Sequence, residues 1–270
     1  MDRNGPEGVL RRALEVLSAG PAGILTDLDG TLAAIIPDPD AVRAAPGVPA
    51  ALSALAGRLA VVGVVTGRAA GDVRRILGPS AERLLVIGNH GLEWIEPGAA
   101  GATPTPELEA AAAAVRSALG ALDALGDPGI RVEDKGLSAT VHYRSAADPA
   151  SARARIAAAL RPALGERLEM RHGRMSVELR PVGVGDKGTA VASVVERYGL
   201  RGLLVAGDDV TDLDMFRTAR RLRSAGDLRA LVVGVGGGAE VPPEVVAAAD
   251  VVLDGPEAVS ALFAALAERL

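Results

Sequence analysis

Short, largely apolar runs recur along this chain, and each of them ends in a polar or glycine-containing turn. We predict buried strands for these runs at 23–26, 60–65, 84–87, 203–206, 231–235 and 250–253. Segments with apolar residues at helical spacing separate most of them. Because parallel strands need crossover helices, this alternation is typical of a parallel sheet covered by helices on both faces. The sequence therefore predicts an α/β fold.

The alternation breaks in the middle of the chain, where one helix and two strands occur twice in succession. The predicted helices cover 106–125 and 149–164, and the predicted strands cover 130–135, 139–144, 167–172 and 175–180. This order is typical of a small α+β unit built from two similar halves. We predict an inserted α+β domain at 104–181 and a larger domain formed by 1–103 and 182–270.

Polar residues gather where the predicted strands end or the next helices begin. They are Asp27, Asp29, Thr66, Lys187, Asp208, Asp209 and Asp212. Ligands bind at the carboxyl ends of strands in open α/β sheets, so we expect these side chains to form one site. Several carboxylates around one point need a cation, and oxygen ligands suit Mg²⁺. A lysine and a hydroxyl beside them suit a phosphate, so the pattern predicts phosphoryl transfer to a carboxylate nucleophile.

Composition supports Lys187 and adds a second candidate, Lys135. Lys135 and Lys187 are the only lysines, whereas all the other basic residues are arginines. Arginine replaces a solvated charge well but fits poorly where a compact ammonium must enter a small pocket. We therefore expect both lysines to have functional roles.

The whole-chain charge and hydropathy exclude several classes of partner. The formal net charge of −5 argues against a nucleic-acid partner. No apolar run reaches the roughly 18 residues of a membrane span, and the charged first twenty residues do not resemble a signal peptide. Without cysteines there are no disulfides or thiolate metal sites. We expect a soluble cytoplasmic protein with no membrane partner.

The motifs resemble those of the haloacid-dehalogenase-like (HAD) phosphatases. The segment 27–31 is similar to their first motif, 66–68 to the second, Lys187 to the third-motif lysine and 207–212 to the fourth. The resemblance implies a HAD-type Rossmann-like core with a parallel sheet and an inserted α+β cap domain of the C2 type.

A narrower resemblance is to the trehalose-6-phosphate phosphatase family. It is carried by the segments 88–93, 133–138, 142–144, 178–181 and 207–216. It implies a Mg²⁺-dependent hydrolase of trehalose biosynthesis that converts trehalose 6-phosphate to trehalose and phosphate through an aspartyl-phosphate. We expect a monomer.

The resemblance also implies a role for each matched residue. Asp27 would attack phosphorus and bind Mg²⁺, and Asp208 would be a further metal ligand. Asp29 would offer its backbone carbonyl to the metal, protonate the departing sugar oxygen and later activate water. Asp209 or Asp212 would hold water in the metal shell, and Thr66 and Lys187 would clamp the phosphoryl oxygens. We interpret Arg68 as a salt-bridge residue and His90 as a residue that shapes its loop.

The inserted domain would bind the sugar through side chains that donate or accept several hydrogen bonds. The candidates are Glu133, Lys135, His142, Arg144 and Glu178. We place Glu133, Lys135, Arg144 and Glu178 on the predicted strands, and His142 is as consistent with packing as with sugar contact.

Three alternatives stay open. The substrate could be another sugar phosphate, such as sucrose phosphate or mannosyl-3-phosphoglycerate, because cap domains diverge. A non-catalytic module that binds a sugar phosphate would keep the fold without turnover. A mutase would need to retain a bisphosphate, and no sequence feature supports it.

Overall fold

The computed structural model describes residues 5–102, 106–122, 125–173, 175–182, 186–236 and 242–270. The chain divides into two compact units, one formed by Met1–Ala102 with Gly185–Leu270 and the other by Thr103–Val184. The boundary expected at 103/104 lies outside the described residues, and the one expected at 181/182 falls where the last strand of the second unit ends.

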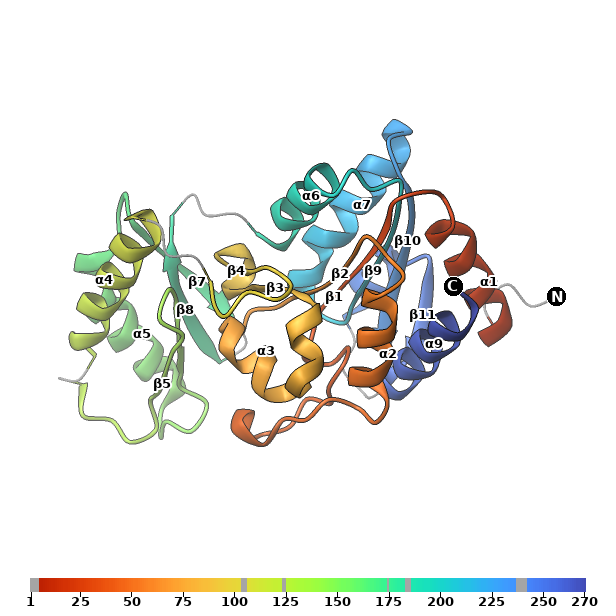
Figure 1. Ribbon diagram of the computed structural model, residues 1–270. Coiled ribbons are helices and arrows are strands. Elements are labelled where there is room, and N and C mark those ends of the chain that lie inside the picture. The colour runs from red at the N-terminus through yellow and green to blue at the C-terminus, as the bar shows by residue number, and fades with distance from the viewer. Residues whose placement is uncertain (1–4, 103–105, 123–124, 174, 183–185, 237–241) are drawn as a thin grey trace. The chain divides into compact units, whose positions relative to one another are not determined.

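The first unit contains a seven-stranded sheet (Figure 1). Its strands in spatial order are β11 (Val251–Asp254), β10 (Arg229–Gly236), β9 (Gly202–Gly207), β1 (Ala22–Thr26), β2 (Val61–Val65), β3 (Leu85–Gly88) and β4 (Glu93–Ile95). Neighbouring strands pair in parallel, except that β4 pairs with β3 in the antiparallel direction. The α/β architecture with a largely parallel sheet is confirmed.

Helices cover both faces of this sheet (Figure 1). The helices of the unit are α1 (Pro6–Leu17), α2 (Val48–Ala56), α3 (Ala70–Leu77), α6 (Lys187–Arg197), α7 (Leu213–Ala225), α8 (Pro243–Ala248) and α9 (Gly255–Arg269). Alternate residues of a strand point to opposite faces. On β9, Leu203 and Val205 pack with α6 and α7, whereas Leu204 and Ala206 pack with α1, α2, α3 and α9. Burial on both faces explains why these strands read as unbroken apolar runs.

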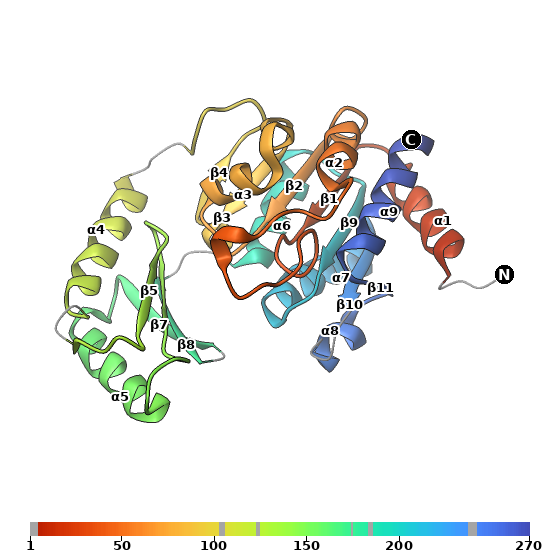
Figure 2. The ribbon, with the colours of Figure 1, turned by 90° about the horizontal axis from the view of Figure 1, so that it is seen from below.

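The second unit pairs four antiparallel strands with two helices (Figure 2). The strand order is β5 (Arg131–Asp134), β6 (Ala139–His142), β8 (Ser176–Pro181) and β7 (Leu168–Gly173), and the helices are α4 (Pro106–Gly120) and α5 (Pro149–Leu160). Both helices pack against the same face of the sheet, where Val141 and Val177 are buried against Val115 and Ile156. This is the α+β insert that the repeated helix–strand–strand pattern predicts.

Several local expectations differ from the structure. The chain after β9 forms a 3₁₀ turn at Val210–Asp212 and continues as α7 to Ala225. Arg217, Arg220, Arg221 and Arg223 lie on this helix, and Arg223 forms an ion pair with Asp250 at 2.6 Å. The short β4 and α8 were not predicted, because three and six residues are too few for a periodic signal.

Within the part of the chain that the structure describes, no helix has both the length and the apolar character that crossing a bilayer requires.

Candidate active site

Asp27 lies directly beyond β1 and is held there by the sheet. Its backbone N–H donates to the Ala206 carbonyl at 2.9 Å, which extends the pairing of β1 with β9 to the carboxylate itself. The chain then turns at Gly30, whose φ is +78°. A Cβ at this glycine would lie 2.0 Å from Oδ2 of Asp208, so only glycine lets the two loops meet. The Thr31 hydroxyl donates to Oδ1 of Asp208 at 3.0 Å.

Lys187 joins the two acidic loops. It is the first residue of α6, whose preceding residue Asp186 caps the helix by accepting the Thr189 N–H at 2.8 Å. The Lys187 Nζ donates to Oδ1 of Asp27 and to Oδ1 of Asp212, in both cases at 2.7 Å. The ammonium is buried, with 2% of the residue exposed. A wider guanidinium would not fit between two carboxylates at these distances.

Asp212 is fixed from both sides. Its second oxygen accepts the backbone N–H groups of Asp208 and Asp209 at 2.9 and 3.1 Å, so the turn after β9 folds around this carboxylate. Asp212 is fully buried, whereas Asp209 is exposed.

Burial and crowding shift the pKa values of these groups. Burial, followed by repulsion from Asp212, raises the pKa of Asp27 well above its usual range, although Lys187 acts in the opposite direction. The same two causes raise the pKa of Asp208 to about 7. Burial alone would lower the pKa of Lys187, but attraction to Asp212 and Asp27 raises it above its ordinary value. A single ammonium therefore leaves the carboxylates undercompensated, which is typical of a cation-binding site.

The donor set fits a divalent cation. Asp27, Asp208 and Asp212 each bring one carboxylate oxygen to within 4.8 Å of the others. All three ligands are carboxylate oxygens and the chain has no cysteine, which favours a hard cation. Of the two residues predicted to hold water in the metal shell, the structure brings Asp212 into this group and leaves Asp209 outside it.

Asp29 and Thr66 occupy the neighbouring positions at this edge of the sheet. The Asp29 carboxylate accepts two bonds from Arg68, one from Nε to Oδ2 at 2.7 Å and one from Nη2 to Oδ1 at 2.8 Å. Thr66 follows β2, is buried, and accepts the Arg68 N–H on its hydroxyl at 3.2 Å. Arg68 is thus the salt-bridge residue that was predicted, and its partner is the candidate acid.

In the second unit, the face of the sheet opposite α4 and α5 carries the polar candidates. Strand register places Glu133 opposite Thr140, Thr140 opposite Glu178, and Glu178 opposite Arg171, so the four side chains form one row. His142 lies in the next row and pairs with Glu133 at 3.2 Å between Nε2 and Oε2. Thr140 and Arg171 were not predicted, because only the register reveals that they share this row.

Two candidates were expected on strands but lie in the turns that follow. Lys135 comes after the end of β5 and donates its N–H to the Ser138 carbonyl at 2.9 Å, which closes the hairpin at Gly136. Arg144 is exposed in the turn after β6, where the Ala146 N–H bonds to the Tyr143 carbonyl at 3.2 Å. In both cases the strand stops earlier than the apolar pattern indicates.

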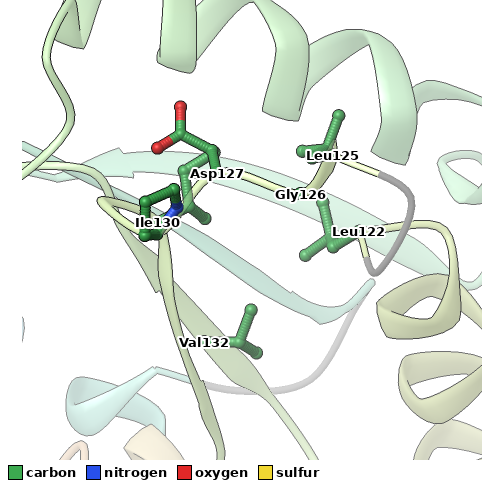
Figure 3. A pocket seen from close by; sticks show the side chains of 7 residues that line it. Leu122, Leu125, Gly126, Asp127, Ile130 and Val132 are labelled. Atoms are coloured by element: carbon green, nitrogen blue, oxygen red, sulfur yellow. The ribbon is translucent and has the colours of Figure 1, made fainter.

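A separate hollow lies within the second unit (Figure 3). It is lined by Leu122, Leu125, Gly126, Asp127, Pro128, Ile130 and Val132. Asp127 is the charged residue of this lining, and its carboxylate forms an ion pair with Arg155. Apart from Asp127, the lining residues are apolar or glycine.

Comparison with known proteins gives one consistent family. The family model described as trehalose-phosphatase matches residues 25–240. A trehalose-phosphate phosphatase of Mycolicibacterium paratuberculosis is 37% identical over 209 residues, which cover 73% of this chain and 51% of that protein. One of Mycobacterium tuberculosis H37Rv is 36% identical over 217 residues, which cover 74% of this chain and 52% of the other. The chain thus spans about half the length of these relatives.

Solved structures agree with the sequence comparison. The Aspergillus fumigatus trehalose-6-phosphate phosphatase is 25% identical and has a TM-score of 0.66, with 97% of this chain and 98% of that chain covered. A trehalose-6-phosphate phosphatase related protein is also 25% identical, with a TM-score of 0.68 over 89% of this chain and 95% of its own.

Proposed function

The chain belongs to the trehalose-phosphatase family, and on this basis we propose that it hydrolyses trehalose 6-phosphate to trehalose and phosphate with Mg²⁺. The observation that carries the proposal is the buried contact of Lys187 with Asp27 and Asp212, beside the carboxylate of Asp208. It supplies a nucleophile, a cation site and a positive charge for a phosphoryl group in one place.

In the first step, an oxygen of Asp27 attacks phosphorus. The bond between phosphorus and the sugar oxygen breaks, and the sugar oxygen takes a proton from the carboxyl of Asp29, so that free trehalose leaves. The ammonium of Lys187 and the hydroxyl of Thr66 would bind the phosphoryl oxygens, where negative charge grows in the transition state.

In the second step, water attacks the phosphorus of the aspartyl-phosphate. Asp29, now a carboxylate, takes the proton of that water, the bond between phosphorus and the Asp27 oxygen breaks, and phosphate leaves. The cycle returns Asp27 as a carboxylate and Asp29 as an acid, so protons and bonds balance.

Asp27, Asp208 and the backbone carbonyl of Asp29 would hold Mg²⁺, with Asp212 or Asp209 behind them. The ion would neutralise phosphate charge and lower the repulsion between the phosphate and Asp27. Its presence would also offset the crowding that raises the pKa values of Asp27 and Asp208.

The insert at 104–181 would act as the cap domain and bind the sugar. The row that contains Glu133 and Glu178, with Lys135, His142 and Arg144 beside it, supports this role, because hydroxyl-rich sugars are bound by such donors and acceptors. The expectations of a monomer and of a cytoplasmic location stay predictions.

The test is phosphate release from a panel of sugar phosphates with and without Mg²⁺. We expect trehalose 6-phosphate to be turned over fastest and only with the cation present. Faster turnover of sucrose phosphate or mannosyl-3-phosphoglycerate would contradict the substrate. If the protein bound a sugar phosphate of the panel but turned none of them over, this result would indicate the non-catalytic module instead.

A further inference from the structure

The segment Gly88–Glu93 forms a tight support behind the loop that carries Thr66 and Arg68. The Asn89 N–H donates to the Arg68 carbonyl at 2.8 Å, and the His90 N–H donates to the Thr66 carbonyl at 2.9 Å. The Glu93 carboxylate accepts the Ala70 N–H at 2.7 Å and the Asn89 side-chain amide at 3.2 Å. The support therefore contacts both ends of the turn from which Arg68 projects.

The backbone of this support is held in an unusual conformation. Asn89 and His90 have φ angles of +49° and +57°, a region that non-glycine residues rarely adopt. The His90 ring also packs directly on Gly67, where a Cβ would lie 2.4 Å from its Nε2. Two consecutive non-glycine residues with positive φ cost folding free energy. Proteins retain such backbone conformations most often where the local geometry serves function.

The supported turn directs Arg68 onto Asp29. The guanidinium binds both oxygens of the Asp29 carboxylate, and its remaining terminal nitrogen donates to the Pro39 carbonyl at 3.0 Å. A two-bond fork fixes the plane of a carboxylate as well as its position. The Arg68 side chain is 12% exposed, so few other conformations are open to it.

We infer that Arg68 is a positioning residue that acts through Asp29, and that the Gly88–Glu93 segment positions Arg68. The inference rests on the proposed function, because that function gives Asp29 its role in proton transfer. In the second step the Asp29 carboxylate takes a proton from water, and this transfer needs the carboxylate oxygen within a hydrogen bond of that water. A carboxylate that turned freely would therefore lower kcat rather than the affinity for substrate.

The test is a double-mutant cycle between Arg68 and Asp29, measured as kcat for a phosphate monoester that the wild type turns over. Asp29→Asn should lower kcat by about 10²- to 10⁴-fold. Arg68→Ala should lower kcat by about 10- to 100-fold and change KM less than about threefold. In the Asp29→Asn background, Arg68→Ala should have almost no further effect, because residues that act as one unit are not additive.

Three further variants separate this role from a general structural one. Arg68→Lys keeps the charge but not the fork, so it should restore only part of the loss. Arg75→Ala is the matched control, because Arg75 donates to the Asp40 carbonyl in the same loop at 2.9 Å without touching Asp29. It should keep wild-type kcat, and thermal unfolding should confirm that all variants fold. Glu93→Ala should lower kcat moderately, again only when Asp29 is present.

If the two losses of kcat multiplied in the double variant with Arg68→Ala and Asp29→Asn, the inference would be overturned. Arg68 would then act directly on the substrate or on the fold. Wild-type kcat in Asp29→Asn would overturn it as well. The trehalose 6-phosphate assignment would survive either result, since it depends only on which substrate the wild type turns over. A Glu93→Ala loss that persists without Asp29 would overturn the role of the supporting segment.

Discussion

Asp27 and Lys187 contact each other at 2.7 Å, and the contact explains what each must be. Asp27→Asn keeps the size of the side chain but replaces the nucleophile with an amide, which is also a weaker ligand for a cation. We expect turnover to fall below a few per cent of the wild-type rate while the protein stays folded. Phosphate release and circular dichroism check this, with Asp72→Asn on the surface as the control.

Lys187→Arg looks conservative but should lower kcat by about 10²- to 10³-fold. The reason is geometric, because the ammonium reaches two carboxylate oxygens at 2.7 Å from inside a closed environment. A planar guanidinium needs more room and would displace the phosphoryl group or Asp27. Steady-state kinetics is the measurement. A wild-type kcat for the variant would show instead that the lysine has no specific role and only reflects the composition of the chain.

Single residues can be predicted where a local pattern in the sequence marks them, whereas contacts between distant segments cannot. Asp27, Lys187 and Asp208 could be identified because each stands at the end of an apolar run or at the start of a helix. The Thr31 bond to Asp208 could not, since it joins residues 177 positions apart. The sequence likewise predicts Arg68 as a salt-bridge residue without naming its partner, because the geometry of the fork with Asp29 depends on the loops after two strands.

At the scale of elements, the parallel strands were predictable and the ends of the insert strands were not. Buried parallel strands are apolar throughout, so their limits coincide with a change of composition. Strands of the insert have one polar face, so hydropathy does not separate a final strand residue from a first turn residue. Lys135 and Arg144 were placed on strands for this reason and lie in turns.

The polar row of the insert gives the prediction that belongs to this scale. Glu178→Ala, or Glu133→Ala with Lys135→Ala, should lower kcat/KM for trehalose 6-phosphate by about 10- to 10³-fold, because buried hydrogen bonds to a substrate are lost. The same variants should barely affect p-nitrophenyl phosphate, which has no sugar.

Comparison of kcat/KM for both substrates in each variant is the measurement. Glu166→Ala, an exposed change just before β7, serves as the matched control and should leave both values unchanged. Equal losses of kcat/KM for the two substrates would mean that the row stabilises the fold rather than binds the sugar.

For the whole molecule, the crowded carboxylates link stability to pH and to cations. The pKa of Asp208 is raised to about 7 in the folded state, from about 3.9 in an unfolded chain. Between these values the folded protein binds more protons than the unfolded one, so the free energy of unfolding should fall as pH rises from about 4 to 7.

Thermal unfolding of chelator-treated protein checks this prediction. Tm should decrease across that range, and Asp208→Asn should reduce the slope.

Mg²⁺ should raise Tm most near and above pH 7, where the carboxylates are ionised, because a ligand stabilises the state that binds it. Activity should disappear with excess chelator, and zinc should support it poorly, since the cluster consists of carboxylates. A Tm that does not respond to Mg²⁺ would contradict the assigned cation site.

The pairing of β1 with β9 also has a consequence for the order in which the protein can be made. Register aligns Ala22–Thr26 with Gly202–Ala206, and the whole insert is encoded between them. At about 5 to 20 residues per second, a ribosome needs about 10 to 40 s to travel from one strand to the other. During that time one edge of β1 has no partner strand, whereas the insert, which is continuous in sequence, has all of its strands once residue 181 has been made. The growing chain can therefore complete the insert before Asp27 meets Asp208.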